Sequence, residues 1–262
     1  PLAHGVSRLF NGTLPARALA ITFDDGYADN EELAAPILKH LGLTATFFVA
    51  TGFLDGGCMF NDRVIEAIRG CRESQLDLTS IGLEVYPMGS TSARQRAIAA
   101  VLSGIKYLEP ARRQDAAEAI ATAAGASGVP RLMMRRDQVR SLREQGMDVG
   151  AHTVSHPILT SVTPRVAMDE LLNSKNELER ILNASVELFA YPNGTPGKDY
   201  TAQHARMARS CGFSGAVSGA WGAATSQSDR HQLPRFTPWD RSRLRFGVRM
   251  LANYCHRAVE AT

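Results

Sequence analysis

The sequence predicts an α/β fold of the (β/α) barrel type, in which parallel strands alternate with helices. Short apolar runs rich in β-branched and aromatic residues are each followed by a stretch with apolar residues at helical spacing. The length of 262 residues is close to the ~250 residues of a single barrel of this type. An open, doubly wound sheet is the alternative that the same alternation allows.

The first alternation lies near the N-terminus. Residues 18–23 form a short apolar run that ends at Asp24-Asp25-Gly26, which predicts a buried strand followed by a loop. The apolar spacing over residues 30–41 predicts a helix, and Gly42 is placed to end it. Residues 44–50 predict a second buried strand. Two strands joined by one helix form a βαβ unit, so we expect a parallel sheet.

The pattern changes between about residues 62 and 130, where we expect a helical insertion. The alternation then resumes, and Thr163 followed by Pro164 predicts the start of a long helix. A C-terminal helix that contains His256 is also expected, because apolar residues recur there at helical spacing. The helices expected after the first βαβ unit are 63–72, 93–105, 111–124, 137–145, 164–182 and 201–211, and the strands are 147–151, 186–191 and 214–217.

The composition is that of a folded globular protein. Hydrophobic residues at 44% and charged residues at 21% exclude a mostly disordered chain. The net charge of +3, scattered along the chain, gives little support for binding to nucleic acid or a membrane surface. No apolar run reaches the ~20 residues of a membrane-spanning helix, and the four cysteines include no Cys-x-x-Cys pair. Because the chain begins at Pro1, we expect that a segment preceded it.

Two groups of polar residues stand directly after predicted strands. Asp24 and Asp25 follow the first strand, where ligands collect in parallel α/β folds. An Asp-Asp-Gly turn without further function is the other interpretation of this tripeptide. His152 and His156 follow a later strand, and two imidazoles four residues apart can reach one metal ion. Most isolated histidine pairs at this spacing bind no metal.

The two groups together point to a catalytic metal site. Two histidines and one aspartate leave a coordination position open for water, and the second aspartate can then act as general base. A third strand end carries the turn Pro192-Asn193-Gly194, which can present a backbone N–H to a developing oxyanion or can serve as a structural turn. A glycosidase is disfavoured, because adjacent carboxylates on a strand point apart and the histidines would have no task.

These motifs resemble those of the polysaccharide deacetylases, carbohydrate esterase family four. The matching segments are Thr22-Phe-Asp-Asp-Gly26, His152-Thr-Val-Ser-His156-Pro157 and Phe189-Ala-Tyr-Pro-Asn-Gly194, within residues 18–236. The resemblance implies a distorted (β/α)7 barrel with seven parallel strands. It also implies removal of N-acetyl groups from sugars with one divalent metal, usually Zn²⁺, although Co²⁺, Ni²⁺ or Fe²⁺ would suit the same ligands.

The resemblance also implies roles for single residues. Asp24 matches the catalytic base and Asp25 the first metal ligand. His152 and His156 match the other two ligands, and Asn193 lies where the family has its oxyanion-hole N–H.

The sequence departs from the family pattern at two positions. Ala190 stands where the third motif usually has the arginine that orients the catalytic aspartate, and we hypothesise that Arg235 supplies the guanidinium instead. A histidine general acid is expected in a late segment, where His231 is the candidate. Tyr27 and Tyr191 adjoin the motifs and are the candidates for contact with a sugar ring.

We therefore expect a single catalytic domain over residues 1–262 that removes N-acetyl groups from N-acetylhexosamines of an exopolysaccharide or cell-envelope glycan. Another hydrolase of the same fold, acting on a formamido sugar, a small amide or an acetyl ester, is the alternative. A catalytically degenerate glycan-binding domain is a second alternative. The expected partner is an N-acetylated oligo- or polysaccharide, with no nucleic acid and no transmembrane segment. The sequence leaves the compartment and any protein partner open.

Overall fold

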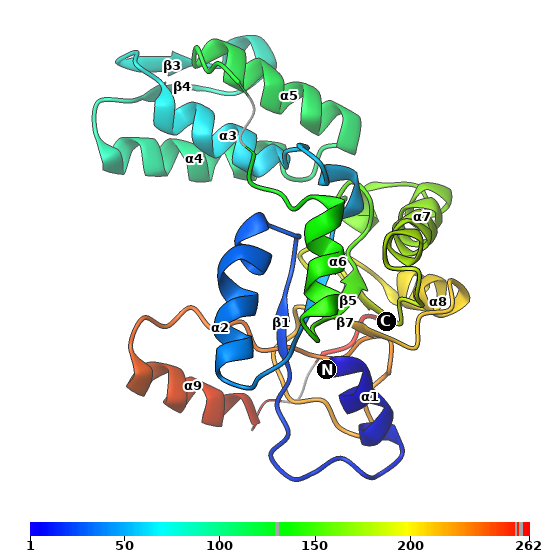
Figure 1. The fold of residues 1–262 in the computed structure, drawn as a ribbon. Helices are drawn as coiled ribbons and strands as arrows, with labels where there is room; N and C mark the ends of the chain where they lie inside the picture. The colour runs from blue at the N-terminus through cyan, green and yellow to red at the C-terminus, as the bar shows by residue number, and fades with distance from the viewer. Residues whose placement is uncertain (129–130, 255, 257–258) are drawn as a thin grey trace. The chain divides into compact units, whose positions relative to one another are not determined.

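The computed structural model describes residues 1–128, 131–254, 256 and 259–262 (Figure 1). The chain folds into two compact units, of which the first comprises Pro1–Leu54 and Met134–Thr262 and the second Asp55–Met133. The second unit corresponds to the insertion expected at about 62–130. That the whole of 1–262 acts as one catalytic domain stays a prediction. Within the described residues, no helix has the length and apolar character that a membrane span requires.

The first unit is built on a curled parallel sheet of five strands in the order β1-β2-β5-β6-β7. Because the strands follow one another in space as they do in the chain, the sheet winds in one direction, as in a barrel, without the reversal of a doubly wound sheet. The predicted α/β barrel class is confirmed, as a half-barrel. The strands are β1 (Ile21–Phe23), β2 (Ala45–Val49), β5 (Asp148–Ala151), β6 (Leu188–Ala190) and β7 (Gly215–Val217).

The sheet contains fewer strands than the family resemblance implied. Where that pattern has seven parallel strands, this sheet has five within the described residues, and one parallel bridge between Val217 and Leu233 extends it past β7. The bridge continues a segment that runs beside β7, since the Ser218 N–H donates to the Leu233 carbonyl at 2.8 Å and the Arg235 N–H to the Ala220 carbonyl at 2.9 Å. This segment brings Arg235 to the carboxyl edge of the sheet.

Alternate residues of the strands face two different apolar layers. Phe47 and Val49 belong to the core between the sheet and its helices, whereas Phe48 lies in the core on the other face, with Val6 of α1 (Leu2–Phe10). The helices that share the larger core are α2 (Ala35–His40), α6 (Arg136–Glu144), α7 (Pro164–Leu182) and α8 (Ala202–Ser210). A π-helical turn over Asn30–Ala34 precedes α2, so the helix expected at 30–41 begins with wider turns.

The longest helix, α7, has the boundaries that its sequence predicts. The Thr163 hydroxyl accepts the Val166 N–H at 3.4 Å, and Pro164 occupies the first turn. The helix ends at Leu182 because Asn183 takes a left-handed backbone, with φ at 48°.

The second unit has its own hydrophobic core. Its helices agree with those expected, and it also contains an antiparallel hairpin, β3–β4, that the sequence did not predict. Each hairpin strand has three residues with one buried side chain, which is too short for a period of two to be recognised. The elements are α3 (Phe60–Gly70), β3 (Gln75–Asp77), β4 (Val85–Pro87), α4 (Thr91–Ile105) and α5 (Pro110–Ala123).

The C-terminal helix, α9 (Arg243–Tyr254), is shorter than expected. His256 lies beyond its last residue and is exposed, so the prediction that places it within the helix is wrong. Leu244 and Leu251 of the apolar stripe are 79% and 71% exposed.

Candidate active site

Four of the predicted site residues lie at the carboxyl ends of three strands of the same sheet, β1, β5 and β6. Asp24 and Asp25 follow β1, His152 follows β5, and Asn193 lies three residues after β6. Asp25, His156 and Asn193 have positive φ angles of 78°, 51° and 58°. A positive φ costs a non-glycine residue conformational free energy. Such residues are concentrated at functional sites, where a side chain has to be held in one direction.

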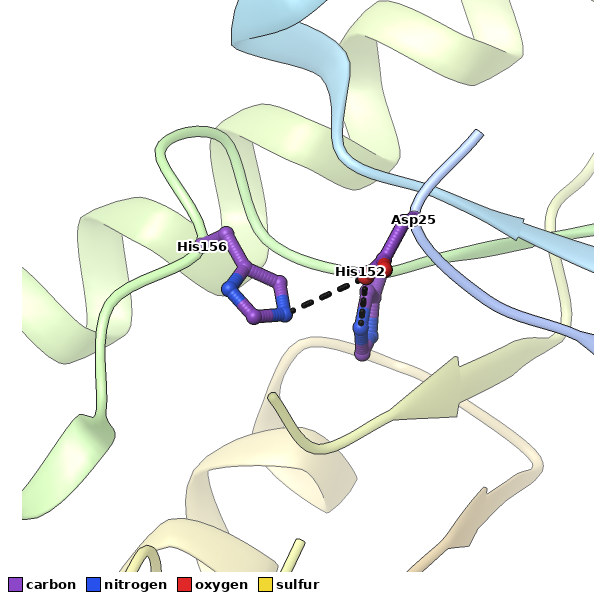
Figure 2. Close-up of side chains that lie close together, drawn as sticks. All are labelled: Asp25, His152 and His156. Carbon is purple, nitrogen blue, oxygen red and sulfur yellow. Dashed lines mark ion pairs between the residues drawn. The ribbon is translucent and has the colours of Figure 1, made fainter. Parts of the chain in front are cut away.

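Asp25, His152 and His156 form a compact cluster of metal-ligand types, as the sequence predicts. Asp25 Oδ1 lies 3.3 Å from His152 Nε2 and 3.3 Å from His156 Nε2. Figure 2 shows the two imidazoles approaching this carboxylate from different directions, both from the loop that follows β5. The three donor atoms lie within 4.8 Å of one another. One carboxylate oxygen and two imidazole nitrogens fit a divalent transition metal with a further position open to water or substrate.

The buried His152 side chain is held in the orientation that a ligand needs. Its Nδ1 lies 2.8 Å from the Ala190 carbonyl oxygen, at the end of β6, so Nδ1 carries the proton and donates it to that oxygen. The lone pair of the neutral ring is then on Nε2, the atom that faces Asp25.

Asp24 is bound by Arg235 through two parallel hydrogen bonds. Arg235 Nη1 donates to Asp24 Oδ1 at 2.7 Å, and Nη2 donates to Oδ2 at 2.8 Å. The guanidinium is itself fixed, because Nε donates to the Ser218 carbonyl at 3.0 Å and Nη1 also donates to the Thr22 hydroxyl at 3.2 Å. The hypothesis that Arg235 replaces the arginine missing at Ala190 therefore has the contact that it requires.

The neighbouring charges lower the pKa of both aspartates, mainly through different partners. Burial acts to raise the pKa of Asp24, but Arg235 and then His152 outweigh it and hold that pKa below its ordinary value. Burial likewise opposes ionisation of Asp25, and the adjacent His152 and His156 side chains, which carry positive charge when protonated, bring the pKa of that carboxyl down. Both carboxylates are therefore ionised near neutral pH. Their charge favours a cation at the histidine nitrogens, either a proton or a metal ion.

Asn193 lies on a tight turn whose shape requires glycine at the next position. Gly194 has a φ of 74°, and a Cβ atom there would lie 2.5 Å from the Gly219 nitrogen. The Gly219 N–H donates to the Gly194 carbonyl at 2.7 Å, which ties the turn to the segment after β7. Asn193 is exposed on this turn. Its role in stabilising an oxyanion stays a prediction.

The structure places Tyr191 in the core instead of in a substrate cleft. Its ring stacks on Tyr200 with centroids 4.0 Å apart, and its hydroxyl donates to the His231 carbonyl at 2.8 Å. It is 1% exposed, and burial raises the pKa of its phenol well above the ordinary value. The expectation of a sugar contact at Tyr191 is therefore corrected. Tyr27 is half-buried in the loop after Asp25, where a substrate contact stays a prediction.

His231 does not fit the acid role suggested by the sequence. Its Nε2 lies 3.0 Å from the carbonyl oxygen of Phe213, which precedes β7 and marks the amino edge of the sheet. Arg235 lies four residues further along the chain, and its backbone N–H donates to the Ala220 carbonyl, past the carboxyl end of β7. The imidazole of His231 therefore points to the edge opposite the Asp24 carboxylate.

One side chain near the metal-type cluster was not singled out from the sequence. Glu170 of α7 accepts three hydrogen bonds from Val154 and Ser155, in the loop between the two histidines. A single glutamate on an amphipathic helix carries no pattern that separates it from its solvated neighbours, so only the fold reveals this contact.

A family model described as polysaccharide deacetylase matches residues 11–216. The chain belongs to the polysaccharide deacetylase family. YxkH of Bacillus subtilis, which carries the name of a polysaccharide deacetylase, is 20% identical over 219 residues, covering 84% of this chain and 50% of YxkH. This member of the family thus spans about half the length of that relative.

Solved structures share the deacetylase fold. Streptococcus pyogenes deacetylase PplD, in complex with acetate, matches with a TM-score of 0.55 and 22% identity, over 88% of this chain and 69% of that one. A de-N-acetylase from Aggregatibacter actinomycetemcomitans matches with a TM-score of 0.53 and 15% identity, over 89% and 75%. At these identities the likeness establishes the fold of this polysaccharide deacetylase family member.

Proposed function

We propose that this chain is a metal-dependent N-deacetylase that hydrolyses acetamide groups of N-acetylhexosamine units in an exopolysaccharide or cell-envelope glycan. The observation that carries the proposal is that two adjacent aspartates have different neighbours. Asp25 lies between two imidazole nitrogens, whereas Asp24 is bound by Arg235. A carboxylate outside the ligand set but beside it is what a general base requires.

The donor set supports a divalent metal at Asp25, His152 and His156, with zinc as the first choice. When bound, such an ion would act as a Lewis acid toward the acetamide carbonyl and would lower the pKa of a water molecule. Cobalt, nickel and iron fit the same ligands, so availability contributes to which metal is used.

The protein groups supply the proton transfer and the orientation. Asp24 is proposed to accept the proton of the attacking water, for which it has to be ionised, as its lowered pKa indicates. Arg235 holds both carboxylate oxygens and keeps the base in one orientation. The backbone N–H of Asn193 is proposed to donate to the oxyanion that forms at the acetamide carbon.

Three observations favour an active enzyme over a degenerate binding domain. Three side chains that could hold a metal lie together, Asp24 beside them is ionised, and Arg235 contacts Asp24 as the guanidinium missing at Ala190 would have to. The N-acetyl substrate is supported by family membership and by the fold shared with the Aggregatibacter protein, which is a de-N-acetylase. The glycan and its linkages are part of the proposal.

Metal analysis joined to product analysis tests the function. We expect about one equivalent of zinc or another divalent transition metal in the purified chain, lost in Asp25→Ala and His156→Ala, and acetate released from N-acetylglucosamine oligomers. Asp24→Asn is the matched variant, which should keep the metal and lose acetate release. Release of formate, or of acetate from O-acetyl groups alone, would indicate the alternative hydrolases. A chain that neither binds metal nor releases any product would refute the proposal and favour the degenerate glycan-binding domain.

A further inference from the structure

The loop that carries both histidines has an unusual backbone. Thr153 and His156 have φ angles of 65° and 51°, so two residues of this short loop are left-handed without being glycine. Residues in this region persist only where their surroundings hold them. The loop direction sets where both Nε2 atoms point, so the groups that hold the loop also set the metal site.

One side of the loop is held by the 3-10 turn after β2 (Thr51–Phe53). The Thr51 N–H donates to the Thr153 carbonyl at 3.1 Å, and the Gly52 N–H donates to the Val154 carbonyl at 2.9 Å. A Cβ atom at Gly52 would lie 2.8 Å from the Val154 oxygen, so this approach requires glycine. These bonds account for two carbonyls of the loop.

The other side is held by a single carboxylate. Glu170 Oε2 accepts the N–H groups of Val154 at 2.7 Å and Ser155 at 2.8 Å, and Oε1 accepts the Ser155 hydroxyl at 2.6 Å. Hydrogen bonds to an ionised acceptor are short and about twice as strong as neutral ones. Glu170 is the seventh residue of α7, beyond the first turn, where the helix dipole favours acidic side chains. The helix dipole therefore does not explain why a glutamate stands at this position.

We propose that Glu170 is a positioning residue of the metal site. It satisfies the two loop N–H groups between the histidines, and it thereby keeps His152 Nε2 and His156 Nε2 directed at Asp25. It does not touch the metal or the substrate. The inference rests on the proposed function, since it assigns Glu170 a role toward the metal held by that site.

The chain offers a matched control on the same helix. Glu179 also accepts a backbone N–H from a loop, that of Val186 at 3.0 Å. Val186 precedes β6, so this contact lies at the amino edge of the sheet, away from the metal ligands. Removing the Glu170 contact disturbs the loop of the metal site, whereas removing the Glu179 contact disturbs a loop far from it. Comparing the two variants therefore separates an effect on the metal site from a general loss of stability.

The test is a titration of chelator-treated protein with Co²⁺, followed by its visible absorption, for the wild type, Glu170→Gln and Glu179→Gln. In Glu170→Gln a neutral amide oxygen replaces the charged oxygen that accepts the Val154 and Ser155 N–H groups, so we expect the metal affinity to fall about 10-fold and the absorption bands to shift. Glu179→Gln should bind with wild-type affinity. Ser155→Ala, which removes one of three hydrogen bonds to Glu170, should give a smaller loss and covers the case in which Glu170→Gln does not fold.

Two outcomes would overturn the inference, and they differ from each other. A folded Glu170→Gln with wild-type cobalt affinity and spectrum would refute the positioning role and leave the metal site intact. Wild-type protein that binds neither cobalt nor zinc would refute the proposed function, and the role of Glu170 with it.

Discussion

The pair between Arg235 and Asp24 makes the most direct prediction about catalysis. We expect Arg235→Met to lower kcat/KM for acetate release by about two orders of magnitude. Each hydrogen bond to a charged group contributes about 1.5–3 kcal/mol, and Arg235 makes two to Asp24, at 2.7 and 2.8 Å. The side chains are 18% and 31% exposed, so the lower end applies, which is about 3 kcal/mol in total.

The same variant should change the pH dependence in a defined direction. The base must be ionised, so activity falls as the pH drops through the pKa of Asp24. Arg235 lowers that pKa, so its removal raises the pKa and moves the acid limb of the kcat/KM profile to higher pH. Arg235→Lys keeps the positive charge but loses the bidentate contact. The acid limb of its kcat/KM profile should therefore lie between those of the wild type and Arg235→Met.

Steady-state kinetics from about pH 4 to pH 9 on N-acetylglucosamine oligomers, with metal content measured on each sample, provide the assay. Arg143→Met is the control, because Arg143 also pairs with an aspartate, Asp148, but at the amino end of β5. Arg235→Met with activity within about threefold of wild type and an unmoved acid limb would refute the reasoning.

Three further substitutions test other parts of the site. Tyr191→Phe should lower the free energy of unfolding by about 1–3 kcal/mol, because the His231 carbonyl loses its buried donor, with KM unchanged; a higher KM would restore Tyr191 to the substrate site. His231→Gln should keep kcat, since its imidazole faces the amino edge of the sheet; a fall of about 100-fold at an unchanged melting temperature would support an acid role. Gly194→Ala should lose about 1–3 kcal/mol, measured by urea unfolding, because its Cβ would meet the Gly219 nitrogen at a φ of 74°; wild-type stability would contradict this.

The cluster of Asp25, His152 and His156 could be predicted because its geometry is nearly local. Asp25 and His152 each follow a strand, and parallel strands present their carboxyl ends at one edge. His156 belongs to the same short loop as His152, so chain connectivity keeps it near. No long-range information beyond the strand pattern was needed to bring these residues together.

Tyr191 shows how proximity to a motif can mislead. It adjoins Asn193 along the chain, but residues two apart on a strand share a face. Phe189 lies in the core between sheet and helices, and Tyr191 lies there with it. Alternation continued one residue past the end of β6 predicts that Tyr191 shares the core with Phe189.

The strand–helix alternation, the three metal-type ligands and the base beside them can all be predicted from the amino-acid sequence, since they depend on periodicity and on which residues follow a strand. The contacts that hold those residues in place are decided by the fold: the Arg235–Asp24 pair is only a hypothesis drawn from the family resemblance, and the Glu170 contact is not predicted at all. Arg235 reaches Asp24 across 211 positions, and Glu170 reaches the histidine loop from the middle of a helix. Neither contact leaves a periodic or local pattern, because a hydrogen bond depends on where two atoms meet in space and not on their separation along the chain.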